Sequence, residues 1–173
     1  MNVSDLRRQW REFKKAFDTH LGPVLGPRWA SKAFTLGLGP VLDDLTKSYK
    51  QTVDAWDKAS SFIPQADKGE MSAINEVQRK MASVVKHAGE VREHAGKAQR
   101  MLDAYQDVLQ QGLNDALRRG SLLPAHQEAF RKAFGSLSVM RAHVEHAMER
   151  ATTYYGRNAE FWQGEYRKRL QRR

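Results

Sequence analysis

The fold is decided by residues 71–119, which read MSAINEVQRKMASVVKHAGEVREHAGKAQRMLDAYQDVLQQGLNDALRR. Apolar and small residues recur every seven positions along this stretch, in two interleaved series. The first series comprises Ile74, Met81, Ala88, Ala95, Leu102, Leu109 and Ala116. The second comprises Val77, Val84, Val91, Ala98, Tyr105 and Gly112. Two such series predict one long helix with a continuous seam that packs against another helix.

Residues 124–170 carry the same pattern. Their two series are Phe130, Leu137, Val144, Ala151 and Asn158, and Ala133, Met140, Ala147, Tyr154 and Phe161. The short segment GSLLP separates this stretch from the preceding one, so the two helices are expected to fold back as an antiparallel hairpin. In the register that places bulky residues against small ones, Ala88 faces Tyr154, Met81 faces Phe161 and Gly112 faces Phe130.

Proline and glycine divide the rest of the chain, with a cluster of both between Gly22 and Pro40. The expected fold is all-α: an elongated four-helix bundle built on a long antiparallel coiled-coil helical hairpin. Its helices are predicted at about 3–20, 40–63, 71–119 and 124–170. A single helical domain over 1–173 is expected, with an amphipathic helix over 1–21, a Gly/Pro connector over 22–40, a helix over 40–63, and a hairpin over 71–170 that protrudes as two helices around 100–145.

The helix over 40–63 is expected to dock on one flank of the long helix, where Ala82, Gly89 and Gly96 lie seven residues apart. Glycine inside a helix costs about 0.5–1 kcal/mol relative to alanine. Two glycines on one stripe therefore indicate that another backbone approaches closely there.

Composition and motifs favour a non-enzymatic protein. The formal net charge is +9, and the chain contains no cysteine, which excludes disulfides and thiolate metal sites. Nucleotide-binding, zinc-protease and nucleophile-elbow motifs do not occur. His143, His146 and Glu149 have the spacing of helical metal ligands, but such spacings arise often by chance. No cofactor, metal or small-molecule substrate is predicted.

Two groups of residues are candidates for binding. Apolar residues that a two-helix hairpin leaves uncovered form a candidate partner-binding surface: Met101, Val108, Leu113, Leu122, Leu123 and Phe134. Basic residues along the seam and at the C-terminal end form a candidate anion-binding group: Lys80, His87, His94, Arg150, Arg157, Arg167, Lys168, Arg169, Arg172 and Arg173. Alternatively, the helix over 3–20 covers the seam and neutralises it with Asp5 and Glu12. The aromatic residues lie at core spacing and are predicted to be core: Trp10, Tyr49, Trp56, Tyr154, Phe161 and Trp162.

These observations favour a helical protein-interaction module, an adaptor, scaffold or chaperone-like component that binds another chain or its own copy through the hairpin. The alternative is a peripheral protein that binds an anionic membrane or nucleic acid through its basic N- and C-terminal helix ends. No signal peptide is expected from the charged N-terminal residues, and no apolar stretch is long enough to span a membrane, so a soluble protein is expected and the cytoplasm is favoured.

Overall fold

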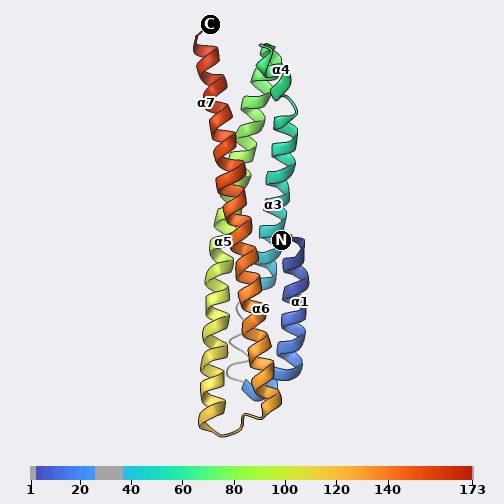
Figure 1. Cartoon of the computed structure of the whole chain (residues 1–173), viewed down its shortest axis with the longest axis vertical. Helices are drawn as coiled ribbons and strands as arrows, with labels where there is room; N and C mark the ends of the chain where they lie inside the picture. Colours follow the sequence, from blue (N-terminus) through green and yellow to red (C-terminus); the bar gives the residue numbers. More distant parts are fainter. Residues whose placement is uncertain (1–2, 26–36, 173) are drawn as a thin grey trace. The chain divides into compact units, whose positions relative to one another are not determined.

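The computed structural model describes residues 3–25 and 37–172 of the chain. In chain order its elements are α1 (Ser4–Ala16), the π-helix η1 (Phe17–Leu21), α3 (Leu38–Ser60), α4 (Ile63–Asp67), α5 (Met71–Arg118), α6 (Pro124–Glu149), the π-helix η2 (Arg150–Gly156) and α7 (Arg157–Gln171) (Figure 1). No strand occurs among these described residues, and the predicted all-α class is confirmed.

Several helix ends lie at or beside the glycine and proline residues that divide the sequence. Gly120 ends α5 with a φ of 64°, a conformation that favours glycine, and the Ser121 N–H donates to the Ala116 carbonyl at 3.1 Å. Pro124 opens α6, as predicted. The helix predicted to start at Pro40 begins two residues earlier, because proline is tolerated within a first turn. Much of the predicted connector, residues 26–36, lies outside the described residues.

The chain divides into two compact units, and the single helical domain predicted over 1–173 stays a prediction. The first unit comprises Met1–Asp43 and Gly96–Glu145. The second comprises Asp44–Ala95 and His146–Arg173. Helices α3 and α5 therefore contribute residues to both.

In the first unit, α1 and the segment after it pack against α5. The rings of Trp10 and Phe13 lie 5.5 and 5.8 Å from the ring of Tyr105, measured between centroids. Leu25 lies against Gly112, where the missing side chain leaves room for it. Residues around 100–145 were predicted to protrude as two helices alone. This prediction is wrong at Tyr105 and Gly112, which other segments cover. Residues 22–25, predicted as connector, are helical and supply part of the cover.

The same unit shows how α5 and α6 run past each other after the turn. Arg141 of α6 forms an ion pair with Asp103 and donates a hydrogen bond to Gln106 at 3.2 Å. The residues predicted for the seam in this unit are buried on both helices: Leu102, Tyr105, Leu109 and Ala116 of α5, and Phe130, Ala133, Leu137, Met140 and Val144 of α6.

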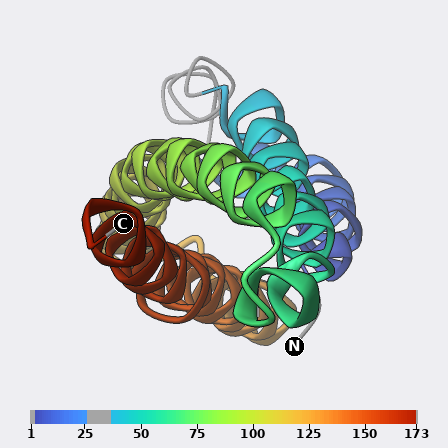
Figure 2. The same cartoon turned by 90° about the horizontal axis from the view of Figure 1, so that it is seen from above.

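In the second unit, α3, α5 and the η2–α7 helix enclose a separate core (Figure 2). It is built on Ile74, Val77, Met81 and Val84 of α5, which meet Tyr155 of η2 and Tyr166 of α7. The Tyr166 hydroxyl donates to Asp67 at 2.9 Å, and Arg169 donates to the same carboxylate at 3.1 Å. Asp67, at the end of α4, thus holds the last turns of α7.

The π-helix η2 changes which residues of the C-terminal helix face the core. Tyr154 and Phe161, predicted for the seam, are 44% and 56% exposed, whereas Tyr155 and Ala159 are buried. A π-helical turn takes up one residue more than an α-helical turn, so the buried positions after Ala151 move on by one. Ala88 accordingly lies beside Gly156, where an added Cβ would be 3.5 Å from the Cβ of Ala88. The predicted pairing of Ala88 with Tyr154 is therefore wrong.

Helix α3 also occupies a different flank of α5 from the one predicted. Gly89 is exposed, and a Cβ built there meets no atom within 4 Å among the described residues. Instead, Gln51 and Lys58 of α3 line a groove together with Lys80 and His87 of α5. Gly89 of α5 therefore does not mark the docking site of this helix.

Candidate functional site

The candidate partner-binding surface splits in two when it is placed on the structure. Val108 is buried at 8% exposure and Met101 is half-buried, so neither belongs to an open surface. Leu123 is 59% exposed, and Leu113, Leu122 and Phe134 are half-buried. Val108 was predicted to be exposed because the sequence analysis left this part of the hairpin uncovered by the N-terminal segment.

A residue that the sequence analysis missed joins this surface. Leu117 is 56% exposed and lies one turn beyond Leu113 on α5. Leu113 and Phe134 each lie one heptad closer to the turn than Gln106 and Arg141, which hydrogen-bond to each other. Leu113 and Phe134 therefore share a face of the two helices. We call Leu113, Leu117, Leu122, Leu123 and Phe134 the turn patch.

Polar groups next to the turn patch are largely paired with one another. Arg118 forms an ion pair with Asp115 at 2.7 Å. Arg131 donates to Glu128 at 3.0 Å, and its hydrogen bond lowers the pKa of the Glu128 carboxyl below its usual value. The turn patch thus combines exposed apolar residues with two nearby pairs of opposite charge, and apolar centres with polar surroundings are typical of protein–protein contacts.

The candidate anion-binding residues on the seam do not form one row of unopposed cations. Lys80 lies 3.8 Å from Glu76, and His87 lies 3.3 Å from Glu90. Arg150 stacks on Tyr154, with 4.6 Å between the guanidinium carbon and the ring centroid. Arg157 lines a groove beside Gly89 instead, and His94 is half-buried. The phase change at η2 turns Arg157 out of the predicted row.

The basic residues at the end of α7 are exposed, but they are not all unopposed. Arg169 is tied to Asp67, and Lys168 lies 3.7 Å from Glu165. Arg167 and Arg172 make no ion pair with another described residue. The predicted Arg173 lies outside the described residues.

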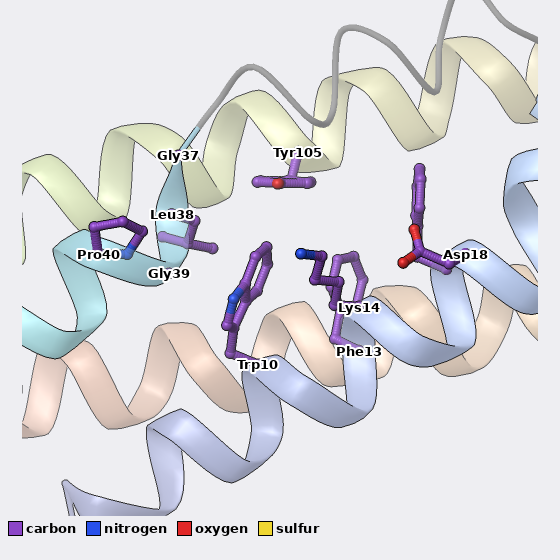
Figure 3. Close-up of a pocket in the computed structure, with 10 residues that line it drawn as sticks. Trp10, Phe13, Lys14, Asp18, Gly37, Leu38, Gly39, Pro40 and Tyr105 are labelled. Carbon is purple, nitrogen blue, oxygen red and sulfur yellow. The ribbon is translucent and has the colours of Figure 1, made fainter.

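A pocket of about 150 Å³ lies in the first unit (Figure 3). Its walls are the rings of Trp10 and Phe13 on α1, Phe17 on η1 and Tyr105 on α5. Lys14 and Asp18 add one charge of each sign. Gly39 of α3 closes one side, because a Cβ at that position would lie 2.8 Å from Nε1 of Trp10.

At this pocket, the hydroxyl of Tyr105 has a raised pKa. Burial raises the pKa of its hydroxyl to about 12, and the nearby Asp18 carboxylate adds to the effect. The hydroxyl, which in an ordinary tyrosine is already neutral near pH 7, therefore stays neutral to a higher pH. Sequence reasoning placed Trp10 and Tyr105 in the core, and nothing in their spacing showed that the packing leaves a pocket between them.

The described part of the chain shows neither a cluster of metal ligands nor a membrane-spanning helix. Within residues 3–25 and 37–172, no three His, Asp or Glu side chains gather as metal ligands would. Over the same residues, no helix has the length and apolar character required to span a membrane. The chain matches no family model, no curated protein and no solved structure.

Proposed function

We propose that the chain is a helical protein-interaction module that binds another protein through the turn patch. The exposure of Leu117 and Leu123 carries the proposal, because each leaves more than half of its surface in water at 56% and 59%. Exposed apolar residues that gather at one place mark interaction surfaces, whereas single ones are ordinary. Here two exposed leucines lie six positions apart at the end of α5 and in the connection to α6, and three half-buried apolar residues belong to the same part of the chain.

The form of the turn patch suggests the kind of partner. Leu113 and Leu117 lie four residues apart on one face of α5, and Phe134 lies on the same face of α6. An apolar stripe across two neighbouring helices suits an amphipathic helix of the partner, whose apolar residues recur at the same spacing. The paired charges beside the turn patch would remain in contact with water.

Site-specific photo-cross-linking tests this proposal directly. Leu117 is replaced by p-benzoylphenylalanine in the cells that make the protein, and the cross-linked products are separated by mass. A discrete heavier species is expected from position 117, and Leu123→Asp should remove it, because a carboxylate cannot be buried unpaired at an apolar contact.

The matched control places the same photoreactive residue at Gln111, which is also exposed on α5. Six residues separate the two positions, so they differ by about 240° around the helix. The same product from both positions, or none from position 117, would contradict the proposal. A product of twice the mass of the chain would identify a second copy as the partner and exclude the distinct protein proposed here.

A second candidate function is the binding of an anionic membrane surface through η2 and α7. Tyr154 and Phe161 are exposed seven residues apart, and Lys168 follows after the same interval. Arg167 and Arg172 extend the positive charge toward the end of the helix. Exposed aromatic rings beside basic residues are typical of helices that lie on lipid headgroups.

Vesicle binding at two salt concentrations tests this second candidate. The protein should bind phosphatidylcholine vesicles that contain phosphatidylserine, and added salt should release it. Arg167→Gln with Arg172→Gln should weaken binding roughly thirtyfold, since each cation near the surface contributes about 1 kcal/mol. The charge-matched control is Lys47→Gln with Lys50→Gln, two exposed lysines of α3. Equal loss in both variants, or equal binding to neutral vesicles, would rule the candidate out.

A further inference from the structure

We propose that the pocket between α1, η1 and α5 binds a small planar aromatic molecule that carries a carboxylate. The proposal concerns a site in the first unit that is separate from the turn patch. It rests on the ring geometry of the pocket, its volume and the placement of its two charged side chains.

The ring geometry suits an aromatic guest. Trp10 and Phe13 are stacked, with 5.8 Å between centroids and 25° between planes. Tyr105 stands edge-on to both rings, at 72° to Trp10 and 88° to Phe13. A further ring placed here finds both a face to stack on and an edge to meet, which are the two arrangements that aromatic pairs prefer.

The volume limits the guest to about one ring. The pocket measures about 150 Å³, and an engineered cavity of that size in another protein accepts benzene. Phe13 and Phe17 are buried at 2% and 3% exposure, so the wall they form is held in place by the surrounding core. An aromatic guest would then gain apolar burial without the protein having to open.

The charged side chains select an anionic substituent at one end. Figure 3 shows the Lys14 ammonium directed toward the space between Trp10 and Tyr105, with Asp18 farther along the pocket. Lys14 makes no ion pair with another described residue, so a carboxylate placed there would supply its counter-charge. Asp18 disfavours an anion at the other end and thereby sets the orientation of the guest.

The start of α3 supports the same polarity. Leu38 and Gly39, in the first turn of α3, line the pocket on the side toward which Lys14 points (Figure 3). The positive end of a helix dipole lies at this terminus, and it stabilises a nearby carboxylate. Lys14 and α3 thus act on the same end of the guest.

Titration with three probes of similar size and different charge tests the proposal on the full chain. Benzoate, benzyl alcohol and benzylamine are added separately, and binding is followed through the indole N–H resonance of Trp10. Benzoate should bind in the millimolar range and at least tenfold more tightly than benzylamine. Lys14→Gln should weaken benzoate binding about tenfold, as expected for one charge-assisted contact, while benzyl alcohol binding stays unchanged.

Two further variants keep the test decisive. Lys15→Gln removes the same charge from the next, exposed residue of α1 and should leave benzoate binding intact. Gly39→Ala places a methyl group against the Trp10 indole and should weaken all three probes together. Absence of benzoate binding, preference for benzylamine, or equal loss in the Lys14 and Lys15 variants would each overturn the proposal.

Discussion

Deletion of Thr153 should leave the protein folded, whereas deletion of Glu160 should lower the free energy of unfolding by about 3 kcal/mol or more. Both residues are exposed, both lie in the C-terminal helix, and they are seven positions apart. Thr153 lies inside η2, where one residue is taken up without advancing the buried face. Its loss can convert the π-helical turns to α-helix and keep Tyr155, Ala159 and Tyr166 in the core.

Glu160 lies in α7, where every residue contributes about 100° of rotation. Its deletion either turns Tyr166 out of the core or returns η2 to α-helix, which would bury Asn158 in place of Ala159. Both routes lose packing that large core side chains normally supply. Urea denaturation followed by circular dichroism measures the two variants. A similar free energy of unfolding for both deletions would mean that η2 does not set the phase of the helix.

Gly156→Leu should destabilise the protein by about 1–3 kcal/mol, the usual cost of overpacking a close contact. A Cβ at position 156 would lie 3.2 Å from the Ala151 carbonyl oxygen and 3.5 Å from the Ala88 Cβ. The backbone carbonyl cannot move aside, and the methyl of Ala88 belongs to a rigid helix. The added side chain must therefore separate η2 from α5 or lie off its preferred rotamers.

Gly89→Leu is the matched control for this substitution. It introduces the same side chain into a helix, but a Cβ at position 89 meets no atom within 4 Å among the described residues. Its melting temperature should be unchanged or higher, because leucine has the better helix propensity. A loss at position 89 as large as that at position 156 would show that a further segment covers Gly89.

Much of the fold was predictable because the heptads of α5 are long and uninterrupted. Ile74, Met81, Leu102 and Leu109 are buried as their spacing predicted. A long helix accumulates many consistent positions, and tertiary contacts rarely override them. The N-terminal amphipathic face was predictable for the same reason, with Leu6, Phe13 and Phe17 in the core.

The failures arise where a local pattern cannot distinguish two structures. The spacing that predicts Tyr154 as core continues smoothly through η2, and only packing of Tyr155 against Tyr49 and Trp56 reveals the extra residue. The docking flank of α3 was inferred from glycine, whose absence of side chain fits a close contact and an open surface equally well. Which helices pack together is decided by contacts between them, and the sequence pattern of one helix does not reveal those contacts.

The candidate sites were predictable in part. Leu113, Leu122, Leu123 and Phe134 were inferred from apolar residues beside the seam, and the spacing of four between Leu113 and Leu117 would have added Leu117. Val108 was misplaced because the helical segment up to Leu25 was treated as connector. The aromatic pocket is formed by residues of α1, η1, α3 and α5 together. No single stretch of sequence could therefore predict it.

The π-helix η2 has a consequence for the way relatives of this chain would be recognised. A π-helical turn takes up one residue more than an α-helical turn, so a chain with one residue fewer in this segment could form a continuous α-helix with the same buried face. A relative that lacks this extra residue would have the same buried face before and after the segment. A comparison with such relatives should therefore allow a gap between Arg150 and Gly156. Without that gap, every residue of α7 would be aligned one position away from its equivalent in the relative. This shift would hide the similarity of the two sequences.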